Sequence, residues 1–100
     1  MMVRYRSRVR EDVAGIYDRI ARDSATAAQR VENTIHRAVG MLAMEPELGV
    51  DIGHKDTRRW PMTEYKYTIF YCVEWDKDYI DVVRVVDSSR VRNLKRVPRA

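Results

Sequence analysis

Most of the candidate functional residues in this sequence are arginines. Arg58 and Arg59 stand together before the first long predicted strand, and Arg84 lies inside a later one. Guanidinium groups bind carboxylates and phosphates through directed, charge-assisted hydrogen bonds. The chemistry indicated is therefore recognition of an anionic or carboxylate-bearing partner. The candidate binding residues are Arg58, Arg59, Arg84, Asp87, Arg90, Arg92 and Arg96.

Residues for other kinds of chemistry are scarce. The two histidines, His36 and His54, have no cysteine or carboxylate near them at metal-ligand spacing. Cys72 is the single cysteine and alternates within an apolar strand, which predicts a core residue. The sequence has no glycine-rich phosphate loop and no nucleophile elbow. We therefore expect no catalytic residue, no metal and no cofactor.

The positive charge is concentrated at the end of the sequence. The formal net charge is +4, whereas residues 89–100 alone contain five cations and no acid. A basic tail indicates an anionic partner, either a nucleic acid or an acidic protein surface. The alternative is a solvated, frayed terminus.

Composition indicates one globular domain spanning residues 1–100, with a basic tail at about 89–100. Hydrophobic residues make up 45% of the chain and charged residues 34%. The sequence shows no apolar run of membrane-spanning length and no secretory signal at its start. With one cysteine it forms no internal disulfide, so we expect a cytoplasmic protein.

The first half of the chain predicts a strand followed by two amphipathic helices. "VRYR" at 3–6 alternates like a short strand, and Ser7 is placed to cap the helix that follows. Ser24 is placed to cap a second helix, which Pro46 and Gly49 end. With almost no loop between them, the helices form an antiparallel hairpin. Their apolar positions are Val9, Val13, Ile16, Tyr17 and Ile20, then Ala28, Val31, Ile35, Ala38, Val39 and Leu42.

The second half changes to the period of strands. "RRWPM" predicts a short strand in which Pro61 marks an edge or an end, and residues 65–75 and 79–86 predict a long hairpin. The order is β-α-α-β-β-β, an α+β domain with an antiparallel sheet and the helical hairpin packed on one face. The other face is free for a partner. Strict alternation places Arg84 on that face, near Lys66 or Glu74, where a cross-strand ion pair is the alternative to partner binding.

Five segments in order resemble the RelE/ParE superfamily of small bacterial toxins. They are "YRSRVREDVAGIYDRIA", "SATAAQRVENTIHRAVGMLAMEPELG", the basic pair before "WPM", "YKYTIFYCVEWDKDYIDVVRVV" and "DSSR". The resemblance implies the toxin of a type II toxin–antitoxin module, associated with plasmid stabilization and neutralised by a co-expressed antitoxin. The long helical hairpin and the "PELG" turn resemble the ParE branch, which implies an inhibitor that binds DNA gyrase. The RelE branch implies the alternative, a ribosome-dependent mRNA endoribonuclease.

The nuclease residues of the RelE branch match this sequence only in part. Arg59 and Arg90 stand at matching positions, whereas Thr68 replaces an expected arginine and Pro61 an expected lysine. No tyrosine follows Tyr79, and Arg96 falls near the position of the catalytic tyrosine. Asp87 stands where many ParE-like members have a histidine. By this resemblance, the sequence keeps cations that would stabilise the charge on the phosphate, but it lacks the residues that would transfer protons. A third hypothesis, from another class, is a non-toxic module whose basic end binds nucleic acid.

Overall fold

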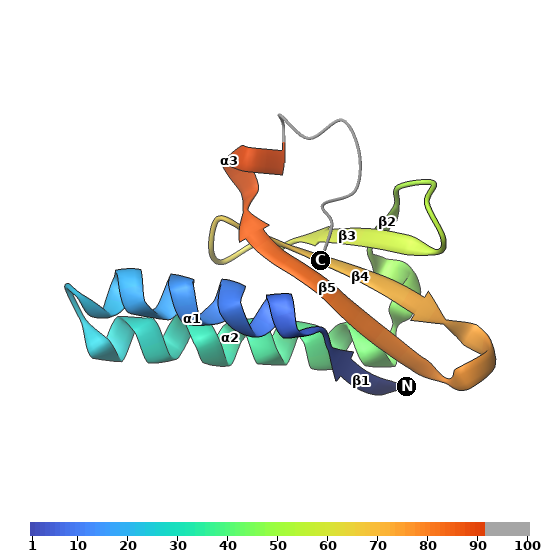
Figure 1. Cartoon of the computed structure of the whole chain (residues 1–100), viewed down its shortest axis with the longest axis horizontal. Coiled ribbons are helices and arrows are strands. Elements are labelled where there is room, and N and C mark those ends of the chain that lie inside the picture. Colours follow the sequence, from blue (N-terminus) through green and yellow to red (C-terminus); the bar gives the residue numbers. More distant parts are fainter. Residues whose placement is uncertain (92–100) are drawn as a thin grey trace.

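The computed structural model describes residues 1–91, so Arg92, Arg96 and the rest of the predicted tail lie outside the described residues. The elements follow the predicted order, with a short strand (β2), two 3-10 helices (η1 and η2) and a four-residue helix (α3) added (Figure 1). They are β1 (Met2–Tyr5), α1 (Ser7–Ala21), α2 (Ala25–Met44), η1 (Pro46–Leu48), β2 (Val50–Asp51), β3 (Thr57–Pro61), β4 (Tyr67–Glu74), η2 (Trp75–Lys77), β5 (Tyr79–Asp87) and α3 (Ser88–Val91).

The strands form one five-stranded sheet in the order β1-β5-β4-β3-β2. The neighbouring pairs from β2 to β5 are antiparallel, as expected. β1, however, runs parallel to β5, so the sheet is mixed and not wholly antiparallel. The helical hairpin carries the chain away from β1 and back, which lets the first strand pair with the last. β2 was not predicted, because two residues are too few to show alternation.

The helical hairpin covers one face of the sheet, as predicted (Figure 1). Ser24 caps α2, since its hydroxyl accepts a hydrogen bond from the Ala27 amide. The predicted cap at Ser7 is wrong: Ser7 is the first helical residue, and Arg6 precedes α1 without a side-chain cap. No helix of the described part has the length and hydropathy needed to cross a membrane. The fully buried centre of the core includes Val9, Ile35, Val39, Leu42, Ile69, Tyr71, Ile80, Val82 and Val85.

The "PELG" turn is tied to the middle of the sheet by Tyr71. The phenol donates a hydrogen bond of 2.7 Å to the Pro46 carbonyl and accepts one of 2.8 Å from the Gly49 amide. Gly49 is needed here for close approach, because an added Cβ would lie 2.8 Å from the Tyr71 Cε1 atom. These hydrogen bonds therefore fix the backbone conformation of the turn between α2 and β2.

The second face of the sheet is not bare, which corrects the expectation of a fully open platform. Phe70, Val83 and Val86 are buried there in a small apolar cluster. Val91 of α3 packs against this cluster, together with Ile52 and Cys72. An exposed site on this face must therefore lie around the cluster and not across it.

Candidate partner-binding site

Arg84 lies next to a β-bulge in β5. Tyr71 pairs with Val82 while its neighbour Phe70 pairs with Arg84, so Val83 is an extra residue in β5. A bulge breaks the two-residue period of a strand and redirects its side chains. Val82 and Val85 consequently both enter the main core although they are three residues apart. Strict alternation therefore fails between Val82 and Val85, although Arg84 is itself paired in register with Phe70 of the second apolar cluster.

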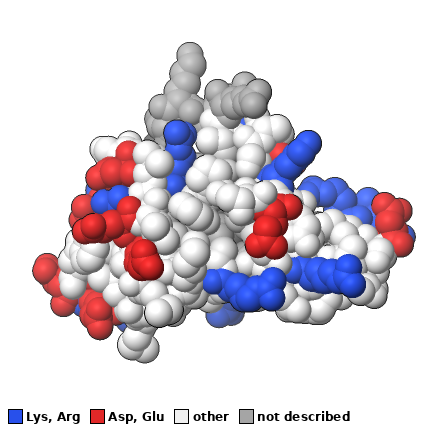
Figure 2. Space-filling model, turned by 180° about the vertical axis from the view of Figure 1, so that it is seen from behind, with Lys and Arg blue, Asp and Glu red and all other residues white. Residues whose placement is uncertain are grey.

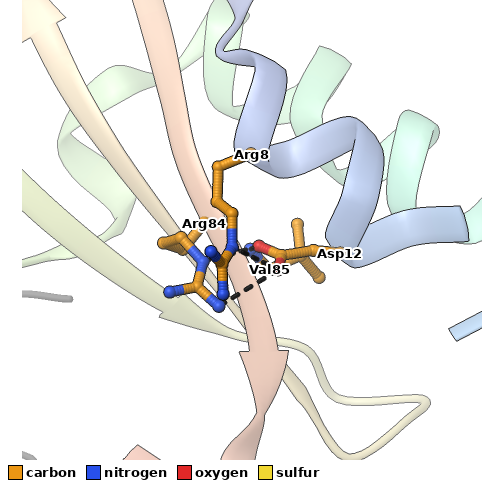
Figure 3. Close-up of polar contacts among 4 residues, drawn as sticks. All are labelled: Arg8, Asp12, Arg84 and Val85. Atoms are coloured by element: carbon orange, nitrogen blue, oxygen red, sulfur yellow. Dashed lines mark hydrogen bonds and ion pairs between the residues drawn. The ribbon is translucent and has the colours of Figure 1, made fainter. Parts of the chain in front are cut away.

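Arg84 instead forms an ion pair with Asp12 of α1 (Figure 3). Its Nε and Nη2 atoms donate to the two carboxylate oxygens over 2.7 and 3.0 Å. The Val85 amide donates to the same carboxylate over 3.0 Å, and Arg8 lies at 3.7 Å. The side chains of Arg84 and Asp12 are only 16% and 9% exposed. The cross-strand ion pair expected near Lys66 or Glu74 is wrong, because the carboxylate that pairs with Arg84 is that of Asp12 in α1. Arg84 therefore joins α1 to β5.

Arg58 is also engaged within the chain. It is half-buried in β3, and its Nη1 atom donates to the carbonyls of Gly49 at 2.7 Å and Glu47 at 3.3 Å. The guanidinium therefore satisfies the carbonyls of the turn that Tyr71 also holds. We assign Arg58 to the fold and leave it out of the candidate binding surface.

Arg59 and Arg90 are the predicted cations that stay exposed within residues 1–91. Arg59 is paired in register with Phe70, so its side chain leaves the sheet on the face of the second apolar cluster. Arg90 lies in α3, which follows β5 directly and packs near the same cluster through Val91. Both guanidinium groups thus belong to the face not covered by the helical hairpin.

Asp87 ends β5 and organises the start of α3. Its carboxylate accepts hydrogen bonds from the amide and the hydroxyl of Ser89, at 2.9 and 2.8 Å. These bonds hold the pKa of Asp87 below its ordinary value, with smaller contributions from Arg19 and Arg90. Asp87 therefore stays ionised down to lower pH than an ordinary aspartate, which suits an anchor better than a proton donor.

Arg19 is a cation of this region that the sequence analysis missed. It reaches from α1 to donate a hydrogen bond of 2.8 Å to the Tyr67 hydroxyl. Beside it, Thr68 is buried and its hydroxyl lies 2.9 Å from that of Ser88. No local pattern could have found Arg19, because 48 residues separate it from Tyr67.

Within residues 1–91, the exposed cations of this surface, Arg59 and Arg90, are suited to binding an anionic partner. Their guanidinium groups remain charged at any physiological pH. Among the described residues, no group of three or more His, Cys, Asp or Glu is arranged to hold a metal ion. His36 lies on α2, where Tyr5 occupies its Nδ1 atom at 3.2 Å.

Charge is divided between the two ends of the molecule. Figure 2 shows, from behind, cations along the helical layer and acids gathered toward the end with the strand turns. Residues 45–56 and 74–78, which form that end, contain seven Asp or Glu and two Lys. An approaching partner of either sign would therefore be oriented before contact.

Comparison with known proteins finds similarity to toxins of toxin–antitoxin systems. Residues 3–92 match the family described as the ParE toxin of the type II toxin–antitoxin system parDE. No curated protein matches the sequence. A solved structure of the chromosomal ParDE TA system from P. aeruginosa is similar with a TM-score of 0.73 and 16% identity, over 87% of this chain and 95% of that one.

Two further solved structures share the fold. One is from the intact E. coli RelBE toxin–antitoxin complex, with a TM-score of 0.62 and 14% identity over 86% of this chain and 94% of the other. The second is the isolated E. coli RelE toxin, with a TM-score of 0.62 and 15% identity over 92% and 96%. At these identities the likeness concerns the fold.

Proposed function

This chain belongs to the ParE toxin family of type II toxin–antitoxin systems, and from that premise we propose that it inhibits DNA gyrase by binding it. A cognate antitoxin neutralises the toxin by binding to it. In this proposal the chain acts by binding alone and catalyses no cleavage reaction. Arg59, Arg90 and the basic segment that follows supply the charge that meets the target or the antitoxin.

The observation that carries this proposal is the state of Thr68. RNA cleavage by 2′-hydroxyl attack needs side chains that accept and donate protons beside cations that stabilise the phosphate. The Thr68 side chain, where the nuclease branch has an arginine, is buried and turned to Ser88. Pro61, at the position of a nuclease lysine, offers no charge and no proton. Binding without catalysis therefore fits these residues best.

A supercoiling assay with purified chain and DNA gyrase tests the proposal. We expect inhibition at micromolar concentrations of the chain, and relief when the product of the adjacent reading frame is added. Primer extension on translating mRNA, run in parallel, should show no new ends. Discrete cuts in the mRNA with uninhibited gyrase would replace the proposal with the endoribonuclease alternative.

Arg90→Ala and Arg59→Ala test the assigned surface. Each removes an exposed cation from the face not covered by the helical hairpin, so we expect about a tenfold or greater loss of inhibition with unchanged folding. Arg30→Ala removes an exposed cation from α2 and is the matched control, which should inhibit like the wild type. Full inhibition by the Arg59→Ala, Arg90→Ala double variant would refute the assignment.

A further inference from the structure

The helix α3 is too short to be stable by itself. It has four residues, Ser88–Val91, whereas isolated helices of fewer than about 12 residues are marginal in water. It follows β5 without a loop and lies on the side of the sheet away from the helical hairpin (Figure 1). Contacts with the sheet must therefore hold it in place.

The first contact joins α3 to β4 through Thr68. The hydroxyls of Thr68 and Ser88 lie 2.9 Å apart, and the Ser88 amide donates to the Lys66 carbonyl over 2.9 Å. Thr68 is only 2% exposed, so its hydroxyl has exchanged water for Ser88. Thr68 pairs in register with Val86, which belongs to the second apolar cluster. The hydroxyl pair therefore fixes the start of α3 against the face that the helical hairpin does not cover.

The second contact is made by Asp87, the last residue of β5. Its carboxylate accepts hydrogen bonds from the amide and the hydroxyl of Ser89, at 2.9 and 2.8 Å. The first amides of a helix have no acceptor within the helix, so a side-chain oxygen before it stabilises its start. Asparagine can accept the same hydrogen bonds through its side-chain oxygen, whereas alanine cannot.

The third contact orients Arg90. Val91 packs against the second apolar cluster, which contains Phe70, Val83 and Val86. Successive side chains of a helix point about 100° apart, because each turn has about 3.6 residues. With Val91 turned to the sheet, Arg90 points away from the cluster and is exposed. The direction of this guanidinium group is thus set by residues that anchor the helix around it.

An anchored α3 has a consequence for binding. Arg59 of β3 is exposed on the same face of the sheet, so the backbone positions from which Arg59 and Arg90 extend are fixed in the free chain. A preorganised pair loses less conformational entropy when a partner binds. Thr68, which stands where the nuclease branch has an arginine, therefore has a different use here: it anchors the segment that carries Arg90.

We propose that Thr68 and Asp87 are positioning residues of the target-binding surface, because they hold α3 so that Arg90 extends from the same face of the sheet as Arg59. The importance of Arg90 for gyrase inhibition rests on the proposed function. The anchoring of α3 rests on the contacts of Ser88, Ser89 and Val91 alone.

Backbone 15N relaxation of the free, full chain tests the anchoring. We expect the order parameter at Arg90 to fall from about 0.85 in the wild type to below about 0.6 in the Thr68→Val, Asp87→Ala double variant. Thr68→Ser keeps the hydroxyl and Asp87→Asn keeps the acceptor, so these variants should stay near the wild type. A wild-type order parameter at Arg90 in the double variant would overturn the proposal.

Asp87→Ala alone keeps this test valid if the double variant does not fold, because Asp87 ends its strand and belongs to neither apolar cluster. The order parameter of Val82, in the main core, is the check on folding and should be unchanged. A rigid Arg90 in a folded Asp87→Ala chain would count against Asp87 as an anchor.

The Asp87 variants also separate position from charge in the gyrase assay. Asp87→Ala and Asp87→Asn remove the same negative charge, and by charge alone both would bind an anionic partner more tightly. Only asparagine keeps an acceptor for Ser89. We expect Asp87→Ala to need about tenfold more chain for half inhibition, because Arg90 is no longer preorganised, and Asp87→Asn to inhibit like the wild type. Equal inhibition by the two variants would overturn the proposal.

A double-mutant cycle shows whether the anchor acts through Arg90. In an Arg90→Ala background, Asp87→Ala should lower inhibition by less than about twofold, because the side chain that it positions is gone. In an Arg30→Ala background, which removes an exposed cation of α2, the same change should keep its full effect. Equal effects of Asp87→Ala in the two backgrounds would mean a general loss of stability and would refute the positioning role.

The two kinds of measurement distinguish this inference from the proposed function. Unchanged gyrase inhibition by variants with a loosened α3 would overturn the inference and leave the function standing. A wild-type chain that does not inhibit gyrase would contradict the function. Relaxation at Arg90 would then still decide whether Thr68 and Asp87 hold it in position.

Discussion

The Arg84–Asp12 pair shows how a cation that looks functional in sequence can be structural. The carboxylate meets three donors within 3.0 Å, two from Arg84 and one from the Val85 backbone. A group buried in this way costs free energy when its partner is removed, because an uncompensated charge stays behind. The pair also closes the free edge of β5, so its loss would loosen the contact between α1 and the sheet.

Arg84→Met should lower the free energy of unfolding by about 3 kcal/mol, since it leaves Asp12 buried without its main partner. Arg8→Met is the control, because Arg8 is 49% exposed and 3.7 Å from the same carboxylate. We expect that change to cost less than about 1 kcal/mol. Urea denaturation of both variants measures the difference. Equal losses in the free energy of unfolding would show that the Arg84–Asp12 pair does not hold α1 against β5.

At the scale of elements, the connection from α2 to β2 depends on a single phenol. Tyr71 is fully buried and bonds both ends of the "PELG" turn, while Arg58 binds carbonyls of the same turn. Burial raises the pKa of Tyr71 above its ordinary value of 10.0. The neutral phenol is thus the form that the fold requires.

Tyr71→Phe should destabilise the protein by about 1–3 kcal/mol, because the buried Gly49 amide loses its acceptor. The pH dependence has a definite sign. With a raised folded pKa, the contribution of Tyr71 is complete below the unfolded pKa of about 10 and is lost as pH rises through the folded pKa. Unfolding measured from pH 8 to 11 should therefore show a smaller alkaline loss in Tyr71→Phe. Burial also raises the pKa of Tyr5, which is present in both proteins and contributes to the alkaline loss that remains.

Both long helices carry a glycine that the described fold does not need. Gly15 and Gly40 have nothing within 4 Å of an added Cβ. Gly15→Ala and Gly40→Ala should each stabilise the isolated chain by about 0.5–1 kcal/mol, because alanine is the better helix former. Thermal unfolding measures this. A loss of stability at Gly40 alone would mean that its open space is not available in solution.

At the scale of the whole molecule, acidic residues gather at one end of the described part, and the basic end of the sequence determines the net charge. Residues 92–100 contain four cations and no acid, so they account for the whole net charge of +4. Long-range attraction of an acidic partner depends on this excess and is screened by salt.

Deleting residues 92–100 should slow association with an acidic partner such as the antitoxin by about tenfold at low salt, and flatten its salt dependence. Stopped-flow or surface-based kinetics at several ionic strengths measure both effects, with circular dichroism as the check on folding. An unchanged association rate would leave this segment without an electrostatic role.

Local pattern was enough to predict most of the elements. The apolar stripes of α1 and α2, the Ser24 cap, and the inward face of β4 at Tyr67, Ile69, Tyr71 and Val73 all depend on residues a few positions apart. The departures from the nuclease residues at Pro61 and Thr68 were also visible in the sequence.

The tertiary structure decided which cations remain available and which edges stay open. The packing of α1 against β5 brought Asp12 to Arg84, 72 residues away, and the path of the "PELG" turn brought backbone carbonyls to Arg58. Within residues 1–91, β1 lies at the edge of the sheet beside β5, and the outer backbone groups of Val3 and Tyr5 have no hydrogen-bond partner. Periodicity in a sequence reports which side of its own element a residue faces. Register, bulges and the pairing of distant strands depend on contacts between elements, so they emerge only when the whole chain is packed.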